Sequence, residues 1–569
     1  MKINVRIAQK EHLSVLEEIE KMPPGEPWIS QDGYVKGYRF RHRYVDEVVT
    51  QRVIQSITWK SPLLIKAQTG AGKSHLIFSK LLPLVKNQKK RIMILAGRTA
   101  LVEQYKRQAV DVEMPYLQEE LKAAIIKLQD SFGAMEVRTY QSVLARIKAG
   151  ELNPQSYDVV VFDECHYFVQ DASFSRETEA ILDVCLEHFK RCKRLYLSAT
   201  PECAAEIVIE KERESAMKDL PERIPWAFYL PPSYEKPVFQ IIDIDQDYSF
   251  IRPIFFTRIE EMLRIIQKDE TEDKYLICVD SKAKGQKIEE ELSSSIADYI
   301  DAELKNSSKS ETIQDIIATE TFRKKVLVVT SFLDVGVNLS DNDIKNVVIF
   351  STDSTHFRQA IGRKRVRYWE KVDLFILVPK VSALNRKVGK LREEYSTMRT
   401  EIQKKEGGNL FITSELPFPL WMENDNGKFQ ISHNSLSLVS NRWRVKELEQ
   451  LCAAALAEDI PDEGIAKTYL RWLGIEEKYR ESRWLGRKPD EQLAGLTELF
   501  ETVAGKTLTE TETAEFREQV QKVCADLGIR CGAKRSRIPD VTVINRMLEA
   551  QRLPYAVERV QNRFSIRRR

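Results

Sequence analysis

Short apolar runs recur along the first two thirds of the chain, and each is followed by a turn or by a helical pattern. The run at 62–66 precedes a glycine-rich turn and then apolar positions at helical spacing over 75–82. The run within 157–166 is rich in β-branched residues and ends in two carboxylates at 163 and 164, which is typical of a central parallel strand. This alternation of buried strands and helices predicts an α/β fold.

The last third of the chain has a different pattern. Residues 442–527 have a mostly helical pattern, and turn-like pieces precede them at 401–408 and 424–427. The final forty residues contain a helical pattern at 541–551. Two short strand-like pieces follow it, at 555–560 and 563–566. We therefore expect a mostly helical C-terminal region that ends in a helix and a hairpin.

The glycine-rich turn between the run at 62–66 and the helical pattern has the context of a phosphate-binding loop. Gly70 and Gly72 allow backbone N–H groups to face an anion, and the helix start adds a positive dipole end. Lys73 can reach the β- and γ-phosphates of ATP, and Ser74 can bind Mg²⁺. The residues expected to contact the nucleotide are Thr69, Gly70, Ala71, Gly72, Lys73 and Ser74. The alternative is a chance glycine-rich turn, because Ala67 stands where the general pattern begins with Gly.

Two carboxylates, Asp163 and Glu164, lie at the end of the strand pattern within 157–166. Asp163 would lie at the carboxyl end of a parallel strand, where it can hold the Mg²⁺ of a nucleotide. Glu164 beside it can orient or deprotonate the attacking water. An Asp-Glu pair at a strand end is often only a solvated loop. About ninety residues after a phosphate-binding loop, however, it indicates the second half of an ATPase site that uses ATP and Mg²⁺.

With that loop in place, the sequence Asp163-Glu164-Cys165-His166 resembles the DExH box of superfamily 2 helicases. Other segments resemble the remaining motifs in the family's order: 92–104, 137–142, 195–201, 275–281, 326–339 and 359–367. The resemblance covers residues 67–367. It implies two tandem RecA-like domains, each built on a parallel sheet, with ATP in the cleft between them.

The resemblance also implies roles for individual residues. Those expected at the nucleotide from the second domain are Asp334, Gly336, Gln359 and Arg363. Those expected to hold nucleic-acid phosphates are Arg98, Thr99, Thr139 and Thr330. Ser198 and Thr200 would couple the state of ATP to domain closure.

Two positions depart from the family's pattern. Val366 stands where the last motif usually has its final Arg, so the second arginine finger is Arg365 or Arg367, and we favour Arg365. No clear adenine-reading motif precedes the phosphate loop. Gln51, within a helix-like stretch at 46–57, is a candidate, and an exposed helix residue is the equal alternative.

Changes of composition divide the chain into four predicted segments: an N-terminal segment at 1–45, an ATP-binding domain at 46–235, a second RecA-like domain at 236–400 and an accessory region at 401–569. The basic aromatic stretch 38–44 could contact nucleic acid, although an edge strand is the commoner structure.

The basic residues gather at the C-terminal end of the accessory region. Residues 530–569 hold eleven Lys or Arg and three acidic residues, a local net charge of +8. A helix and basic hairpin of this kind resemble a winged-helix unit, and a footprint on nucleic acid is one interpretation. A solvated tail is the other.

Composition adds few constraints. The chain has 569 residues, is 43% hydrophobic and carries a net charge of +3, so the whole molecule is not a simple polycation. No apolar stretch approaches the roughly 18 residues of a membrane span, and the N-terminus lacks a signal-peptide core. Eight scattered cysteines form no Cys-x-x-Cys pair, so we expect neither zinc nor a disulfide framework, and a cytoplasmic protein that contacts no membrane.

Together these features predict an ATP-dependent helicase or translocase that acts on nucleic acid, with DNA favoured over RNA. Its role would lie in replication, repair or mobile-element maintenance, and the chain resembles helicases of mobile elements and viral origin-binding proteins. A second hypothesis is the motor of a restriction or anti-phage system. No fused nuclease is recognisable, because no His follows His433 and Pro539-Asp540 lacks a following Glu-x-Lys. A third hypothesis is an ATP-gated DNA-binding initiator that does not unwind.

Overall fold

The computed structural model describes residues 14–41, 44–218, 237–301, 316, 319–330, 339–367, 369–407, 416–425, 428–485, 494–526, 539–550, 553, 555–561 and 563–568. By its internal contacts the chain divides into two compact units. The first holds residues 1–251, 271–373 and 387–448, and the second holds residues 252–270, 374–386 and 449–569. Each unit is described by itself below.

The first unit contains a nine-stranded sheet in the order β1-β2-β9-β3-β8-β7-β4-β6-β5. In that order the strands are Pro27–Ile29, Val35–Phe40, Phe239–Ile244, Leu63–Lys66, Lys193–Ser198, Tyr157–Asp163, Arg91–Ala96, Met135–Thr139 and Ser131–Phe132. Neighbours from β2 to β6 pair in parallel, and only the edge strands β1 and β5 are antiparallel. The prediction of a central parallel strand within 157–166 is confirmed.

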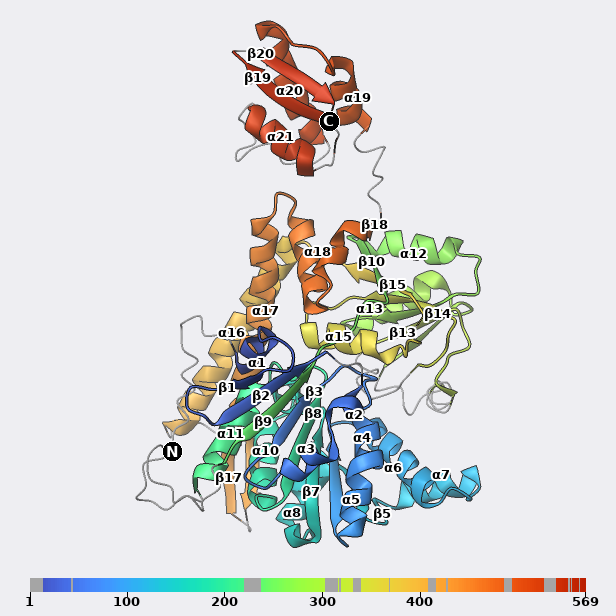
Figure 1. Ribbon diagram of the computed structural model, residues 1–569, viewed down its shortest axis with the longest axis vertical. Helices are drawn as coiled ribbons and strands as arrows, with labels where there is room; N and C mark the ends of the chain where they lie inside the picture. The colour runs from blue at the N-terminus through green and yellow to red at the C-terminus, as the bar shows by residue number, and fades with distance from the viewer. Residues whose placement is uncertain are drawn as a thin grey trace. The chain divides into compact units, whose positions relative to one another are not determined.

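Helices cover both faces of this sheet (Figure 1), which explains why its strands are continuous apolar runs. One face is covered by α8 (Tyr140–Lys148), α10 (Thr178–His188) and α11 (Ala205–Lys218), which share a buried cluster with the strands. The other face is covered by α4 (Lys73–Leu76), α5 (Leu82–Asn87), α6 (Thr99–Glu113) and α7 (Glu119–Leu128). A π-helical turn, η1 (Ile77–Leu81), joins α4 to α5.

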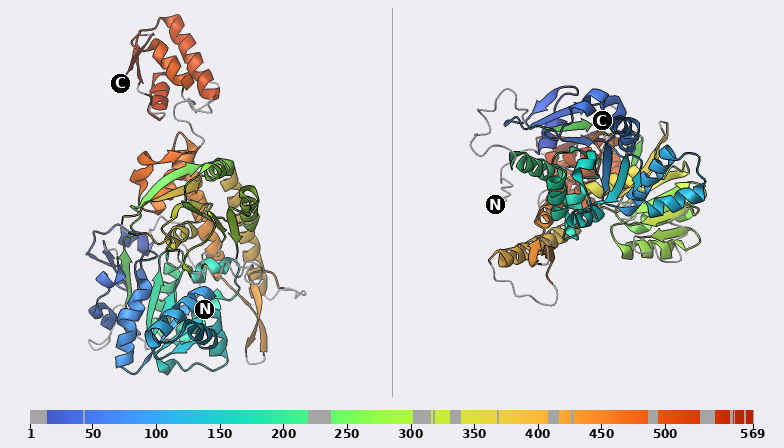
Figure 2. Two further views of the ribbon diagram at one scale, coloured as in Figure 1. Left: turned by 90° about the vertical axis from the view of Figure 1, so that its right-hand side faces the viewer. Right: turned by 90° about the horizontal axis from the view of Figure 1, so that it is seen from below.

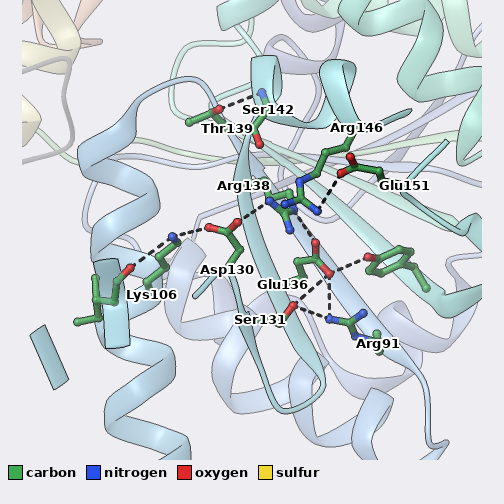
Figure 3. Close-up of polar contacts among 12 residues, drawn as sticks. Arg91, Lys106, Asp130, Ser131, Glu136, Arg138, Thr139, Ser142, Arg146 and Glu151 are labelled. Carbon is green, nitrogen blue, oxygen red and sulfur yellow. Dashed lines mark hydrogen bonds and ion pairs between the residues drawn. The ribbon is translucent and has the colours of Figure 1, made fainter. Parts of the chain in front are cut away.

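Strand β6 carries charged residues in a buried position, and each of them is paired (Figure 3). Glu136 is 3% exposed and accepts hydrogen bonds from the guanidinium groups of Arg138 and Arg91 and from the hydroxyl of Tyr157. A buried carboxylate is tolerated only with such partners. The network fixes the end of β6, where the Thr139 hydroxyl caps α8 by accepting a hydrogen bond from the Ser142 amide.

A second sheet has seven strands in the order β12-β13-β11-β14-β15-β10-β18. In that order the strands are Ala297–Ile300, Val326–Val329, Lys274–Cys278, Ile344–Ile349, Val372–Leu377, Ile251–Phe256 and Arg483–Trp484. The pairs among β12, β13, β11 and β14 are all parallel. Its helices include α12 (Ile259–Lys268), α13 (Lys282–Leu292) and α15 (Ser354–Arg363). The predicted pair of RecA-like parallel-sheet domains is therefore confirmed.

Three local predictions differ from the structure. Strand β2 lies inside the first sheet, so the 38–44 stretch is not an edge strand; β1, from the turn-rich piece before it, takes the edge. The 46–57 stretch is two short helices, α2 (Val45–Val48) and α3 (Gln51–Ser56), rather than one. The first sheet also recruits β9, which comes after the 46–235 segment.

The predicted turn at 401–408 is also wrong, because helix α16 (Val381–Glu406) continues through most of it. Leu391, Met398 and Ile402 are all buried, at a spacing that places them on one helix face. The helix persists because this apolar face has a partner to pack against, which outweighs the polar sequence of its last turn.

We define the arm as residues 387–448, which comprise most of α16, the hairpin β16–β17 (Leu420–Asp425 and Lys428–His433) and the first part of α17 (Leu436–Ala457). Asn434 donates a hydrogen bond to the Thr178 hydroxyl (2.9 Å), and the Ser435 amide donates to Glu179 (2.7 Å). Leu436 is buried in the core of the first sheet. The arm is thus anchored to α10.

The arm also contacts helix α15. Glu447, which is 4% exposed, accepts hydrogen bonds from the amide and the hydroxyl of Ser354, the first residue of α15. Burial, reinforced by the charge of Asp353, raises the pKa of Glu447 to about 8. Within the first unit the arm therefore connects α10 with the start of α15.

In the second unit, helices α19 (Ala494–Val503), α20 (Glu510–Asp526) and α21 (Val541–Ala550) pack on the hairpin β19–β20 (Tyr555–Val560 and Arg563–Arg568), as Figure 2 shows. Phe500, Phe516 and Tyr555 form the centre of their own buried core. The predicted helix and hairpin at the C-terminal end are confirmed. Among the described helices, none has the length and apolar character needed to cross a membrane.

Candidate active site

The loop between β3 and α4 has the backbone of an anion-binding cradle. Gly70 and Gly72 both have φ of 89°, a left-handed conformation that other residues adopt only with strain. Gly72 is also the N-cap of α4, so the first amides of that helix point into the loop. Lys73 is buried, and its Nζ donates to the carbonyl oxygen of Ala67 at 2.9 Å. This arrangement suits the phosphates of a nucleotide.

Asp163 lies beside this loop, at the carboxyl end of β7. It is 4% exposed, and its Oδ2 accepts a hydrogen bond of 2.7 Å from the hydroxyl of Tyr105 on α6. Ser74 Oγ in turn donates to the Tyr105 hydroxyl at 3.3 Å. Tyr105 thus brings together the two residues predicted to bind Mg²⁺. A carboxylate and a hydroxyl are oxygen donors of the kind that a hard cation prefers.

Glu164 adjoins Asp163 and is held in a strained backbone conformation, with φ of 50°. Burial opposes its ionisation, yet the charges of Lys73, His166 and Arg363 hold the pKa of Glu164 below its usual value. Burial and the neighbouring Glu164 charge raise the pKa of Asp163 to about 7. Glu164 Oε2 is buried and lies 3.3 Å from His166 Nδ1, but it accepts no hydrogen bond from the described residues, so it can accept one from a water molecule.

His166 joins three predicted motifs at one point. Its Nδ1 lies 2.9 Å from Ser198 Oγ, and its Nε2 lies 2.7 Å from Gln359 Nε2 on α15. Ser198 Oγ also accepts a hydrogen bond from the Thr200 amide. The two residues predicted to couple ATP to closure therefore connect, through His166, to a residue predicted to approach the γ-phosphate.

Helix α15 comes very close to the phosphate loop. A Cβ on Gly362 would lie 2.6 Å from Thr69 Cβ, so only glycine fits there. Arg363 is 7% exposed, and its Nε has no acceptor among the described residues. Arg365 lies against the loop, since a Cβ on Gly70 would be 2.5 Å from its Nη1. The site thus presents two guanidinium groups to the place where phosphates would lie.

Arg367, the alternative second finger, is placed differently. Its side chain is exposed, and its backbone amide donates to Glu370 Oε2 at 3.2 Å. The geometry therefore places Arg365, rather than Arg367, next to the phosphate loop.

The remaining predicted residues lie in several environments. Gln51 is exposed at the start of α3, and Thr99 is exposed at the start of α6. Thr139 is the N-cap of α8. Asp334 and Gly336 lie outside the described residues. Gln51 and Thr99 thus point to solvent, whereas the Thr139 hydroxyl is engaged by its own helix.

Arg98 and Thr330, both predicted to hold phosphates, line one cavity of about 730 Å³ in the first unit. Arg98 forms a two-pronged ion pair with Asp171, one contact of which measures 2.9 Å. Thr99 and Thr139 do not line this cavity. The structure therefore brings two of the four predicted phosphate contacts together.

Sequence reasoning missed a buried ion pair that also joins the two sheets. Arg358 on α15 contacts Glu202, which follows Ser198 and Thr200, at 2.7 Å. Burial opposes the charge of Glu202, but Arg358 and Lys66 lower the pKa of that carboxyl to about 2. Lys66 is the last residue of β3, so the pair continues to the strand before the phosphate loop. Nothing in the sequence distinguishes these charges from surface ones.

Two family models match the chain. Residues 39–203 match the res subunit of type III restriction enzymes, and residues 257–365 match the helicase conserved C-terminal domain. These two matches follow one another in the order of a helicase motor. The chain therefore carries both motor domains of a superfamily 2 helicase, a class of nucleic-acid-dependent ATPases.

Several solved helicase structures match parts of the chain. Dbp5 of S. cerevisiae bound to RNA and ADP BeF3 has 16% identity and a TM-score of 0.39, with 62% of this chain and 84% of that chain covered. The Mycobacterium smegmatis helicase Lhr bound to ssDNA and AMP-PNP has 12% identity and a TM-score of 0.39, with 83% and 59% covered. No curated protein matches the sequence. The family assignment rests on the two family models.

Tyr105 provides a direct test of the site's geometry. The substitution Tyr105→Phe removes the hydroxyl that links Ser74 to Asp163 but keeps the packing of the ring. Because such supporting contacts typically matter by 10- to 100-fold, we expect roughly a tenfold higher Mg²⁺ requirement for ATP hydrolysis. Titration of Mg²⁺ at fixed ATP measures this.

Tyr157→Phe is the matched control, since Tyr157 lies at the other end of β7 and donates to Glu136. It should leave the Mg²⁺ requirement unchanged. An unaltered requirement in Tyr105→Phe would show that Tyr105 does not position the metal ligands.

Proposed function

We propose that this protein is an ATP-driven translocase that separates or moves along DNA. The observation that carries the proposal is the single buried site in which Lys73, Asp163 and Glu164 of the first sheet meet Gln359 and Arg363 of α15. Charges buried together in this way need a partner of opposite sign or a role in catalysis. A bound nucleotide supplies that partner.

The roles of the residues follow from their positions. Ser74 and Asp163 would hold Mg²⁺, which neutralises charge on the β- and γ-phosphate oxygens when bound. Lys73 positions the same phosphates from the loop. Glu164, ionised and with an oxygen that accepts no other hydrogen bond, orients a water molecule and takes its proton. Arg363 and Arg365 stabilise the charge that develops during phosphoryl transfer.

Motion would come from the contacts of α15. Gln359 and Arg358 both reach the first sheet, through His166 and Glu202. Loss of the γ-phosphate would remove the ligand that holds Arg363 and Arg365 against the loop, and the two sheets would separate. Repeated closure and opening would then shift the bound strand.

The phosphate contacts of the strand would come from Arg98, Thr99, Thr139 and Thr330. Contacts of this kind carry little sequence information, so specificity should be low. DNA is the favoured substrate, supported by the restriction-enzyme name of the first matching family model and by the basic C-terminal module. A cytoplasmic role in replication, repair or mobile-element maintenance fits such an activity.

That family name also favours a second candidate, the motor subunit of a restriction or anti-phage system. In that case a nuclease would be supplied by a separate protein. Strand displacement on a tailed duplex separates both motors from an ATP-gated DNA-binding initiator, which would bind and hydrolyse ATP without unwinding.

The direct test compares ATP hydrolysis with no polymer, with single-stranded DNA, with duplex DNA and with RNA. We expect single-stranded DNA to stimulate turnover most. Glu164→Gln should bind ATP but hydrolyse it at least about 100-fold more slowly, since it keeps the shape and loses the base. Lys73→Ala should show no turnover, and near-normal turnover in that variant would contradict the nucleotide assignment.

The two arginine fingers allow a finer test. Arg363→Ala and Arg365→Ala should each lower kcat by roughly two or more orders of magnitude, as transition-state arginines do. Arg367→Ala should cost far less, because that side chain is exposed. Measured kcat values at saturating ATP decide this. If Arg367→Ala were as damaged as Arg363→Ala while Arg365→Ala were active, the assignment of the second finger would be reversed.

A further inference from the structure

Three parts of the first unit enclose the cavity of about 730 Å³. The first-sheet domain contributes Arg98 and the segment 169–174, and the second-sheet domain contributes residues of 278–284 and 349–360. The arm closes the remaining side with residues of 387–394 and 440–448. The arm lies outside both matching family models, the second of which ends at residue 365.

Phe174 stands out on the first-sheet wall of this cavity. Its side chain is 65% exposed, although most large aromatic side chains of that domain are buried. Its backbone is fixed nevertheless: its amide donates to the carbonyl of Asp171, and Asp171 is held by Arg98. The next residue, Ser175, accepts a hydrogen bond from Asn434 of the arm. An exposed aromatic ring that lines a cavity offers a stacking surface for a base.

The arm presents a cation to the same cavity. Arg444 on α17 is exposed, lines the cavity and makes no ion pair or hydrogen bond among the described residues. The arm's other two lining cations are paired, Lys387 with Asp280 and Lys390 with Glu394. Arg444 is therefore the arm residue best placed to bind a phosphate of a nucleic acid.

We propose that this cavity holds single-stranded nucleic acid, with a base stacked on Phe174 and a phosphate bound by Arg444 of the arm. The proposal rests on the proposed function and adds the class of strand and the arm's part in binding it. An aromatic ring can stack on an unpaired base because the face of that base is free. Inside a duplex, the neighbouring base pairs cover the faces of each base.

The arm's contact with α15 gives strand binding a route to the ATP site. Arg444 is one helical turn before Glu447, which holds Ser354 at the start of α15. A strand bound at Arg444 fixes this part of α17, and hence the end of the helix that carries Gln359 and Arg363. Variants that weaken strand binding here should therefore also raise the strand concentration needed to stimulate ATP hydrolysis.

The test uses the full-length protein and fluorescence anisotropy with a labelled oligothymidylate, together with a blunt duplex DNA of the same length. Phe174→Ala should raise the Kd for the single strand roughly tenfold or more, the size of a lost stacking contact. Phe174→Tyr keeps the ring and should bind like the wild type. Thermal unfolding shows whether each variant is folded.

Two arginines of α17 form a matched pair of variants for the second part of the test. Arg444→Glu should raise the Kd for the single strand and flatten the plot of log Kd against log salt by roughly 0.7. Arg442→Glu changes the same charge two residues away, where the guanidinium lies 5.2 Å from the Tyr395 ring rather than in the cavity. It should bind, and hydrolyse ATP, like the wild type.

The outcomes separate this proposal from the proposed function. A wild-type protein that no nucleic acid stimulates would overturn the function itself. A stimulated wild type, with Phe174→Ala and Arg444→Glu binding the single strand as tightly as it does, would overturn only the present proposal. So would variants that lose affinity for the blunt duplex more than for the single strand.

Discussion

One buried contact, between His166 and Gln359, is the point on which the rest of the structure depends. It joins the segment that follows Asp163 and Glu164 to the helix that carries Arg363, at 2.7 Å. Because His166 also touches Ser198, a change at any one of these segments must be felt by the other two. A buried polar network is costly when incomplete, so it favours two discrete arrangements, closed or separated, over intermediate ones. Such two-state behaviour is what a nucleotide-driven motor requires.

The arm extends this connection away from the ATP site. It is anchored to α10 through Asn434 and to α15 through Glu447, and between these points it forms one wall of the cavity. The buried ion pair of Arg358 and Glu202 is a second connection between α15 and the first-sheet domain. Binding in the cavity and hydrolysis in the loop are therefore linked by short chains of packed, hydrogen-bonded side chains. No long-range mechanism is needed to explain how a strand could stimulate turnover.

The sequence predicts best where local pattern and burial agree. The strand that begins at Tyr157 was predicted because it is buried on both faces, and the phosphate loop because Gly70 and Gly72 have no substitutes. Contacts made by distant residues were not predictable: Tyr105 is an ordinary helix residue until α6 packs beside Asp163. The continuation of α16 past residue 401 was missed because its stability comes from tertiary packing. Whether Arg365 or Arg367 faces the loop depends on the path of the chain after α15, which no local pattern records.

The most direct measurement of the central claim is a double-mutant cycle between His166 and Gln359, read as kcat for strand-stimulated ATP hydrolysis. If these residues act together to close the site, His166→Ala and Gln359→Ala should be non-additive, with a coupling free energy of about 0.5–3 kcal/mol. The control cycle pairs His166→Ala with Gln155→Ala, an exposed residue on the same domain, and should be additive. Additivity within about 0.3 kcal/mol for His166 and Gln359 would contradict the account, because the two sheets would then contribute to hydrolysis independently.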